Sequence, residues 1–346
     1  MIRILITEDS EVVATLLKTI FEAEADMRVV GWARNGREAV TLVHDLKPDI
    51  VTMDIRMPVM DGFDATLMIM STDPTPIVVV SSSVDDEELR ITFRAIDEGA
   101  LAVIEKPRGL NHPDFETIRG QLVEMVRAMA EVKVVRRRRP RPGAGIFQTR
   151  LPRRTGTLEV VGIACSTGGP QTLSTILGGL PVGFPLPILV VQHISAGFVG
   201  GLANWLRGQT LLDIGLAQNG QPLVGGAVYI APDGFHLEAA RIGGRLVAHL
   251  DDAPPSGGFR PSGNALFHSL ARVCPTTAVG GILTGMGSDG AAGLAALHEV
   301  GGQTFTQDEE SAVVYGMPGA ALALNAIDRV VPLARIPTHL IELARS

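Results

Sequence analysis

Short apolar runs alternate with amphipathic segments along almost the whole chain. In the first 127 residues five such runs are each followed by polar residues and by a stretch with helical spacing. They are RILIT (3–7), MRVVGWA (27–33), DIVTMD (49–54), PIVVVSS (76–82) and ALAVIEK (100–106). This alternation predicts βαβ units around a parallel sheet, the (βα)5 arrangement of a flavodoxin-like domain.

The chain from residue 158 onward repeats the alternation and predicts a second α/β domain. We expect strands at 158–164, 187–193, 276–284 and 303–307, helices at 170–178, 197–207, 262–273, 289–300, 311–324 and 334–344, and a hairpin around 228–240 and 245–251. The apolar strands and their helical connections predict a doubly wound, mostly parallel sheet with an antiparallel edge.

Between the two halves the periodicity fails, and residues 131–156 read EVKVVRRRRPRPGAGIFQTRLPRRTG. Like charges extend such a segment, and proline and glycine prevent it from forming a core. Nucleic-acid binding by RRRRPRP (136–142) is the alternative, but prolines interrupt any helical basic face and no aromatic side chains are interleaved in this run for stacking. We therefore predict one domain at 1–127, a tether at 128–157 and a second domain at 158–346.

Composition agrees with this organisation. The 346 residues exceed what one core usually organises, and 46% hydrophobic content with 4% aromatic residues fits aliphatic parallel strands. A net charge of −7 argues against general nucleic-acid binding, and two cysteines exclude a disulfide framework. The N-terminus MIRILITEDS reaches acidic residues too early for a signal peptide, and no apolar stretch could span a bilayer. We expect a soluble, cytoplasmic protein without membrane insertion.

Polar side chains follow the predicted strands of the first half. Glu8 and Asp9 come after the first strand, Asp54 ends the third, Ser81 the fourth and Lys106 the fifth. Three carboxylates at one sheet edge repel one another, and Mg²⁺ relieves this while leaving coordination positions for phosphate. Asp54 is then the expected nucleophile for a phosphoryl group, and Lys106 and Ser81 would contact the transferred oxygens.

This pattern resembles the response-regulator receiver domain. The resemblance is carried by EDS (8–10), DIRMPVMDG (54–62), VVSS (79–82) and EKP (105–107). It implies that a partner histidine kinase phosphorylates Asp54, with Glu8, Asp9 and Mg²⁺ supporting the transfer. One departure is Val103, which stands where many receivers carry an aromatic switch residue.

Three candidate catalytic residues follow strands of the second half. Ser166 comes after LEVVGIAC, His193 ends PILVVQH, and Asp289 ends TTAVGGILTGMGSD. A serine, a histidine and an aspartate at one sheet edge suggest a serine hydrolase. Each alone has an ordinary interpretation; Asp289, for example, could cap the following helix. The chain order and Ala164 before the turn also differ from the α/β-hydrolases.

The second half closely resembles the catalytic domain of chemotaxis protein-glutamate methylesterases. Its motifs are CSTGGP (165–170), QHISAGF (192–198), VYIAPDGFHL (228–237), RPSGNALF (260–267), LTGMGSDGAAGL (283–294) and QDEESAVVYGMPGAA (307–321). The resemblance implies that Ser166 attacks glutamyl methyl esters of methyl-accepting chemoreceptors, with His193 as base and Asp289 orienting it. It also implies oxyanion donors at Thr167 and the Met286 N–H, and no cofactor for the ester chemistry.

Three further alternatives follow from the same residues. A Cys–His pair could also hydrolyse esters, but Cys165 and Ser166 point to opposite faces of the strand, so we expect Cys165 to be buried. The output domain could instead bind DNA or signal without catalysis. The sequence alone leaves open whether glutamine side chains are deamidated.

Overall fold

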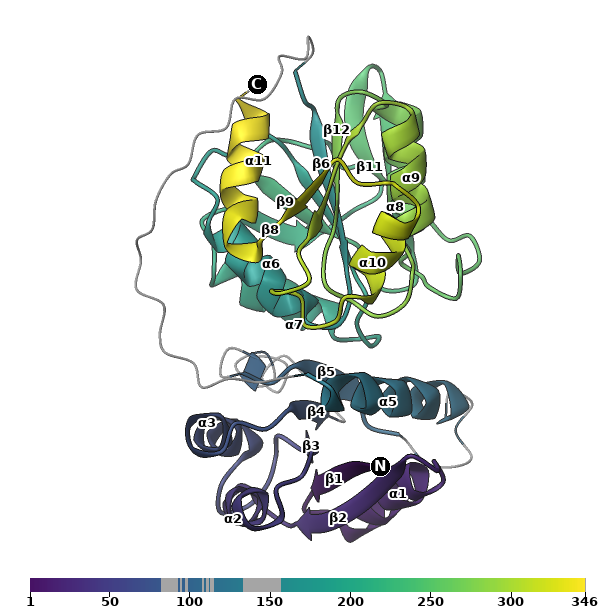
Figure 1. Cartoon of the computed structure of the whole chain (residues 1–346). Coiled ribbons are helices and arrows are strands. Elements are labelled where there is room, and N and C mark those ends of the chain that lie inside the picture. The colour runs from purple at the N-terminus through teal and green to yellow at the C-terminus, as the bar shows by residue number, and fades with distance from the viewer. Residues whose placement is uncertain are drawn as a thin grey trace.

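The computed structural model describes residues 1–81, 93, 95–96, 99–107, 109, 112, 115–132 and 157–345, and it contains two α/β domains (Figure 1). The N-terminal domain has the strands β1 (Ile2–Thr7), β2 (Met27–Ala33), β3 (Ile50–Met53), β4 (Ile77–Ser81) and β5 (Ala102–Glu105). Its helices include α1 (Glu11–Glu22), α2 (Gly36–Leu46), α3 (Gly62–Thr72) and α5 (Phe115–Ala130). The strands pair in parallel in the order β2-β1-β3-β4-β5, which confirms the predicted fold.

Local capping fixes where three of these helices begin. In each case a short polar side chain just before the helix accepts a hydrogen bond from the backbone N–H three residues on, as helix N-caps do. The caps are Ser10, Asn35 and Asp61, which accept from Val13, Glu38 and Asp64, respectively. Most of the predicted basic tether, residues 133–156, lies outside the described residues.

The C-terminal domain is built around a larger sheet. Its strands are β6 (Val160–Cys165), β7 (Ile188–Gln192), β8 (Asp213–Leu216), β9 (Ala227–Ile230), β10 (His236–Ile242), β11 (Arg245–Asp251), β12 (Ala278–Ile282), β13 (Gln303–Gln307) and β14 (Arg329–Val331). Its helices are α6 (Gly169–Gly178), α7 (Val199–Arg207), α8 (Gly263–Val273), α9 (Ala291–Glu299), α10 (Gly316–Ala323) and α11 (Ile336–Ala344), the last preceded by a 3-10 turn (Leu333–Arg335).

Seven of these strands form one parallel sheet in the order β14-β13-β12-β6-β7-β9-β8. The predicted antiparallel edge is therefore wrong. β10 and β11 pair antiparallel with each other in a separate two-stranded sheet, and β9, which the sequence placed in that hairpin, pairs in parallel with β7 and β8. The chain leaves β6 toward β7 on one side and returns to β12 on the other, and this switch point is where open α/β sheets bind ligands.

Glycines let side chains pack directly on the centre of this sheet. A Cβ on Gly162 of β6 would lie 2.6 Å from Leu270, and one on Gly280 of β12 would lie 2.4 Å from Leu294. Helices α8 and α9 therefore approach the sheet more closely than larger residues would allow. None of the described helices is both long enough and apolar enough to cross a bilayer.

Gly281→Ala should destabilise the C-terminal domain. The new Cβ would lie 2.3 Å from Cζ of Phe305, whose ring is fully buried and packs edge-on against His339. The ring has no room to retreat, so we expect the free energy of unfolding to fall by about 1–3 kcal/mol. Urea denaturation followed by circular dichroism measures this.

Gly200→Ala on α7 is the matched control, because a Cβ there meets nothing within 4 Å. We expect its midpoint to stay unchanged or rise, since alanine favours helices over glycine. Equal midpoints for the two variants would contradict this account of the packing.

Candidate active site

Ser166 lies in the turn between β6 and α6. Its backbone N–H donates to the carbonyl of Thr284 at 3.0 Å, which ties this turn to the segment that follows β12. Gly168 has φ +77°, and a Cβ there would lie 2.6 Å from Val313, so the turn requires glycine. Ser166 is thereby held beside the first turn of α6, where backbone N–H groups favour negative charge.

His193 and Asp289 form a hydrogen-bonded pair next to this turn. Nε2 of His193 lies 2.9 Å from Oδ2 of Asp289, and the side chains are only 8% and 3% exposed. Burial raises the pKa of Asp289, but hydrogen bonds from His193 and Ser262 outweigh it, so this pKa lies below its ordinary value. Because an ionised carboxylate can only accept, Nε2 is assigned as the donor, and in the neutral imidazole the lone pair is then on Nδ1.

The alternative in which Asp289 caps the following helix is wrong. Helix α9 begins at Ala291, and its N-cap is Gly290, without a side-chain hydrogen bond. The carboxylate of Asp289 turns instead to the start of α8, where it accepts from the N–H of Gly263 at 2.6 Å. Gly290, with φ +89°, forms a turn between Asp289 and α9, and the Asp289 carboxylate binds the start of α8 and not that of α9.

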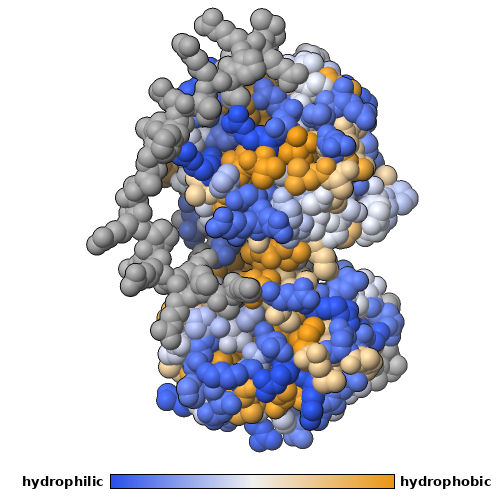
Figure 2. Space-filling model, in the orientation of Figure 1, coloured by the Kyte–Doolittle hydropathy of each residue, from blue (hydrophilic) through white to orange (hydrophobic). Residues whose placement is uncertain are grey.

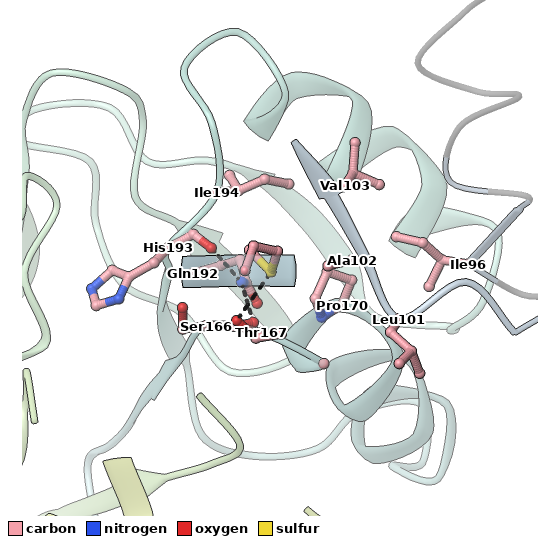
Figure 3. A pocket seen from close by; sticks show the side chains of 12 residues that line it. Ile96, Leu101, Ala102, Val103, Ser166, Thr167, Pro170, Gln192, His193 and Ile194 are labelled. Carbon is pink, nitrogen blue, oxygen red and sulfur yellow. Dashed lines mark hydrogen bonds between the residues drawn. The ribbon is translucent and has the colours of Figure 1, made fainter. Parts of the chain in front are cut away.

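Of the two hydrogen bonds of a Ser–His–Asp triad, the described residues make only the one between His193 and Asp289. Nδ1 of His193 is buried, and among the described residues neither it nor the Ser166 hydroxyl has a hydrogen-bond partner. The ring of Phe259 stacks on the imidazole, with centroids 4.3 Å apart and planes 11° apart. Figure 3 shows Ser166 and His193 lining one pocket.

The two candidate oxyanion donors, Met286 and Thr167, have different surroundings in this structure. The backbone N–H of Met286 has no hydrogen-bond partner among the described residues, whereas the neighbouring Gly285 N–H is bound to the carbonyl of Val314 at 2.9 Å. Thr167 follows Ser166 directly, and its hydroxyl lies 3.8 Å from the sulfur of Met125, a residue of α5. One donor therefore faces the N-terminal domain.

Gln192 had no role in the sequence-based prediction, yet its side chain connects the ends of β6 and β7. The Gln192 Nε2 donates to the carbonyls of Ser166 and His193, both at 2.8 Å, and its Oε1 accepts from the Cys165 thiol at 3.1 Å. Cys165 is fully buried, as predicted, and burial raises the pKa of its thiol far above the ordinary value. The only sequence feature that could have indicated a role for Gln192 is its position directly before His193.

The acidic residues of the N-terminal domain also meet at one edge. One carboxylate oxygen from each of Glu8, Asp9 and Asp54 lies within 4.8 Å of the others. Lys106 bridges two of them, with its Nζ 2.8 Å from Glu8 and 2.9 Å from Asp54. Ser81, at the end of β4, is buried one register position from Lys106.

The electrostatics of this cluster suit a divalent cation. Burial raises the pKa of Asp54, and the nearby Lys106 offsets this only in part; burial and the charge of Asp54 likewise raise the pKa of Glu8. A hard cation with oxygen ligands would hold these carboxylates ionised. The residues present therefore fit Mg²⁺.

The two domains meet at the candidate active site. Figure 1 shows α5 and β5 facing α6 and α7, and Figure 2 shows apolar surface at this junction. The Gln171 amide donates to the carbonyl of Ile96 at 3.1 Å, and the Glu105 N–H donates to the Ser195 hydroxyl at 3.4 Å. The pocket in Figure 3 is lined from the C-terminal side by Ser166, Thr167 and His193 and from the N-terminal side by Leu101, Val103 and Met125.

Comparisons with known proteins identify the family of each domain. A family model described as CheB methylesterase matches residues 161–340, and one described as response regulator receiver domain matches residues 4–112. A Geobacter metallireducens protein named protein-glutamate methylesterase/protein-glutamine glutaminase 4 is 45% identical over 99% of both chains. A Nitrosospira multiformis protein with the same activities in its name is 44% identical over 99% of this chain and 97% of its own.

A solved structure matches the C-terminal domain. The crystal structure of the Thermotoga maritima CheB methylesterase catalytic domain is 37% identical, with a TM-score of 0.53, and covers 54% of this chain and all of its own. The alternative of a DNA-binding output is therefore wrong, because the C-terminal half has the sheet and the motifs of a methylesterase domain. The chain belongs to the CheB methylesterase family and carries a response-regulator receiver domain in front of the methylesterase domain.

Proposed function

We propose that this protein hydrolyses the methyl esters of glutamyl side chains in methyl-accepting chemoreceptors, releasing methanol, and also deamidates glutamine side chains of these receptors. The named activities of relatives that match the whole chain support both reactions. The observation that carries the proposal is the buried His193–Asp289 pair at 2.9 Å beside Ser166, at the switch point of a parallel sheet.

In the proposed mechanism the Ser166 hydroxyl attacks the carbonyl carbon while His193 takes its proton. Because Nε2 is bound to Asp289, Nδ1 is the nitrogen that receives this proton. The imidazolium then gives the proton to the departing methoxide, which leaves as methanol, or to the departing amino group of an amide substrate, which leaves as ammonia. A water molecule, deprotonated by the same nitrogen, resolves the acyl-enzyme to a carboxylate and restores Ser166.

The negative oxygen of the tetrahedral intermediate needs donors that are already in place. We assign this role to the N–H of Met286 and to Thr167. Met286 fits because its N–H has no other acceptor among the described residues and lies in a glycine-flanked loop. Thr167 fits because it adjoins Ser166 at the start of α6, but its hydroxyl is in contact with Met125 of the receiver in this form.

Asp54 is the proposed phosphorylation site of this protein in the cytoplasm, with a partner histidine kinase as the phosphodonor. Glu8, Asp9 and Asp54 would hold Mg²⁺, which supplies positive charge for the phosphoryl oxygens. Lys106 now binds Glu8 and Asp54 directly, so a phosphoryl group on Asp54 gives this ammonium a new acceptor. Ser81 would donate to the same group.

The receiver restrains the esterase in this proposal. Side chains of β5 and α5 line the pocket that contains Ser166, which leaves little room for a receptor segment. The Glu105–Ser195 contact joins the residue before Lys106 to the loop that follows His193. Rearrangement around phosphorylated Asp54 would loosen this contact and open the site.

Ser166→Ala should abolish ester hydrolysis without changing the fold, with a rate loss on the order of 10⁴ to 10⁶. Asp289→Asn should lose less, because it keeps the volume but presents the wrong partner to the imidazole. Methanol release from methylated receptor measures both. Retention of more than roughly a tenth of the activity by Ser166→Ala, with unchanged circular dichroism, would remove Ser166 from the mechanism.

Alkylation should separate Ser166 from Cys165 as the nucleophile. Iodoacetamide requires a thiolate, and Cys165 is buried with a raised pKa, so the folded protein should stay unlabelled at this residue and fully active. Mass spectrometry of the folded and urea-unfolded protein, together with the methanol assay, checks this. Inactivation that parallels labelling of Cys165 would favour a thiol mechanism.

Removal of residues 1–140 should raise basal methanol release, whereas Asp54→Ala in the full chain should stay low and ignore a small phosphodonor. About 1.4 kcal/mol of differential stabilisation suffices for tenfold activation. Asp64→Ala, which removes an exposed carboxylate of α3, is the matched control and should respond like wild type. Equal rates in all four proteins would show that the receiver does not gate the esterase.

A further inference from the structure

The carboxylate of Asp289 has four hydrogen-bond donors, and only one of them is His193. Oδ2 accepts from Nε2 of His193 at 2.9 Å and from the N–H of Gly263 at 2.6 Å. Oδ1 accepts from the hydroxyl of Ser262 at 2.7 Å and from the N–H of Asn264 at 3.3 Å. Both oxygens are therefore fixed, and three of the four donors come from the start of α8.

The direction of the Ser262 hydroxyl is determined by its surroundings. Ser262 is completely buried, and its oxygen accepts a hydrogen bond from the N–H of Asn264 at 3.1 Å. Because that N–H occupies a lone pair, the hydroxyl proton is left for Asp289. Ser262 thus donates to the carboxylate while it caps α8, which is more than an ordinary N-cap does.

The position of α8 makes this arrangement possible. Gly263 packs so closely that a Cβ would lie 2.8 Å from the Cβ of Ala164, two residues before Ser166. The first turn of this eleven-residue helix therefore packs on β6. Its N–H groups, which have no acceptor within the helix, are directed at Asp289. The positive end of the helix dipole and the Ser262 hydroxyl both favour the ionised carboxylate.

An anchored carboxylate controls the imidazole. With both oxygens held, Oδ2 stays aligned with Nε2, so the proton remains on that nitrogen and the lone pair on Nδ1. Without the Ser262 hydroxyl, Oδ1 would lose its shortest bond and the carboxylate could rotate away from the ring. We infer that Ser262 is a positioning residue for the reaction, acting through Asp289 to fix the orientation and tautomer of His193. This inference rests on the proposed hydrolase function.

Two variants separate this role from helix capping. Ser262→Ala removes both the hydroxyl and the cap, whereas Ser262→Gly removes the hydroxyl but keeps a residue that is accepted at N-cap positions. If the hydroxyl acts on Asp289, both variants should lose kcat by about 10- to 100-fold with KM unchanged. A capping role alone would leave kcat intact and give Ser262→Ala a lower unfolding midpoint than Ser262→Gly.

Ser269→Ala is the matched control on the same helix. Ser269 is also completely buried, but its hydroxyl binds only backbone groups, the N–H of Ala239 at 2.9 Å and the carbonyl of Leu266 at 2.7 Å. This variant should lose stability while its kcat stays at the wild-type value. A kcat loss in Ser269→Ala equal to that in the Ser262 variants would overturn the inference.

A spectroscopic measurement tests the inference independently of turnover. In ¹⁵N-histidine-labelled full-length protein, wild-type His193 should show a protonated Nε2 and an unprotonated Nδ1, and both Ser262 variants should show exchange between the two tautomers. An unchanged tautomer in these variants would overturn the role of Ser262. If wild type releases no methanol from methylated receptor, the proposed function fails, and this spectrum still decides the role of Ser262.

Discussion

The parallel pairing of β6 with β7 on one side and β12 on the other is the constraint on which the active site depends. Parallel strands end at the same edge, so this pairing brings the turn at Ser166, the strand end at His193 and the loop that contains Asp289 together. Gln192 then ties the first two segments through a single amide. Residues separated by more than one hundred positions in the chain are thereby fixed by backbone hydrogen bonding.

Much of this arrangement could be predicted from local patterns. Apolar runs of four to seven residues identified the buried strands, and the polar residues that follow them identified Ser166, His193 and the acidic cluster of the receiver. The edge strands β8 and β14 escaped prediction because they are short and partly exposed, and therefore lack a continuous apolar run. β9 was assigned to the wrong sheet because strand pairing depends on distant partners.

The contacts that complete the site could not be predicted in the same way. Ser262 precedes a helix and has the signal of an ordinary N-cap, and its contact with Asp289 exists only because α8 packs on β6. The stacking of Phe259 on His193 likewise joins residues from separate loops. Side chains from the receiver line the pocket only because the two domains dock, which no local pattern encodes.

The two tryptophans of the chain occupy informative positions. The indole of Trp32 donates to the backbone carbonyl of Glu8 at 2.7 Å, beside the acidic cluster of the receiver. Trp205 stacks on Phe93 across the domain junction, with ring centroids 5.7 Å apart. Indole emission responds to nearby charge and to water. The chain therefore has one natural fluorophore beside the proposed phosphorylation site and another at the junction between the two domains. Occupancy of the acidic cluster and separation of the domains can thus be followed optically in the unmodified protein.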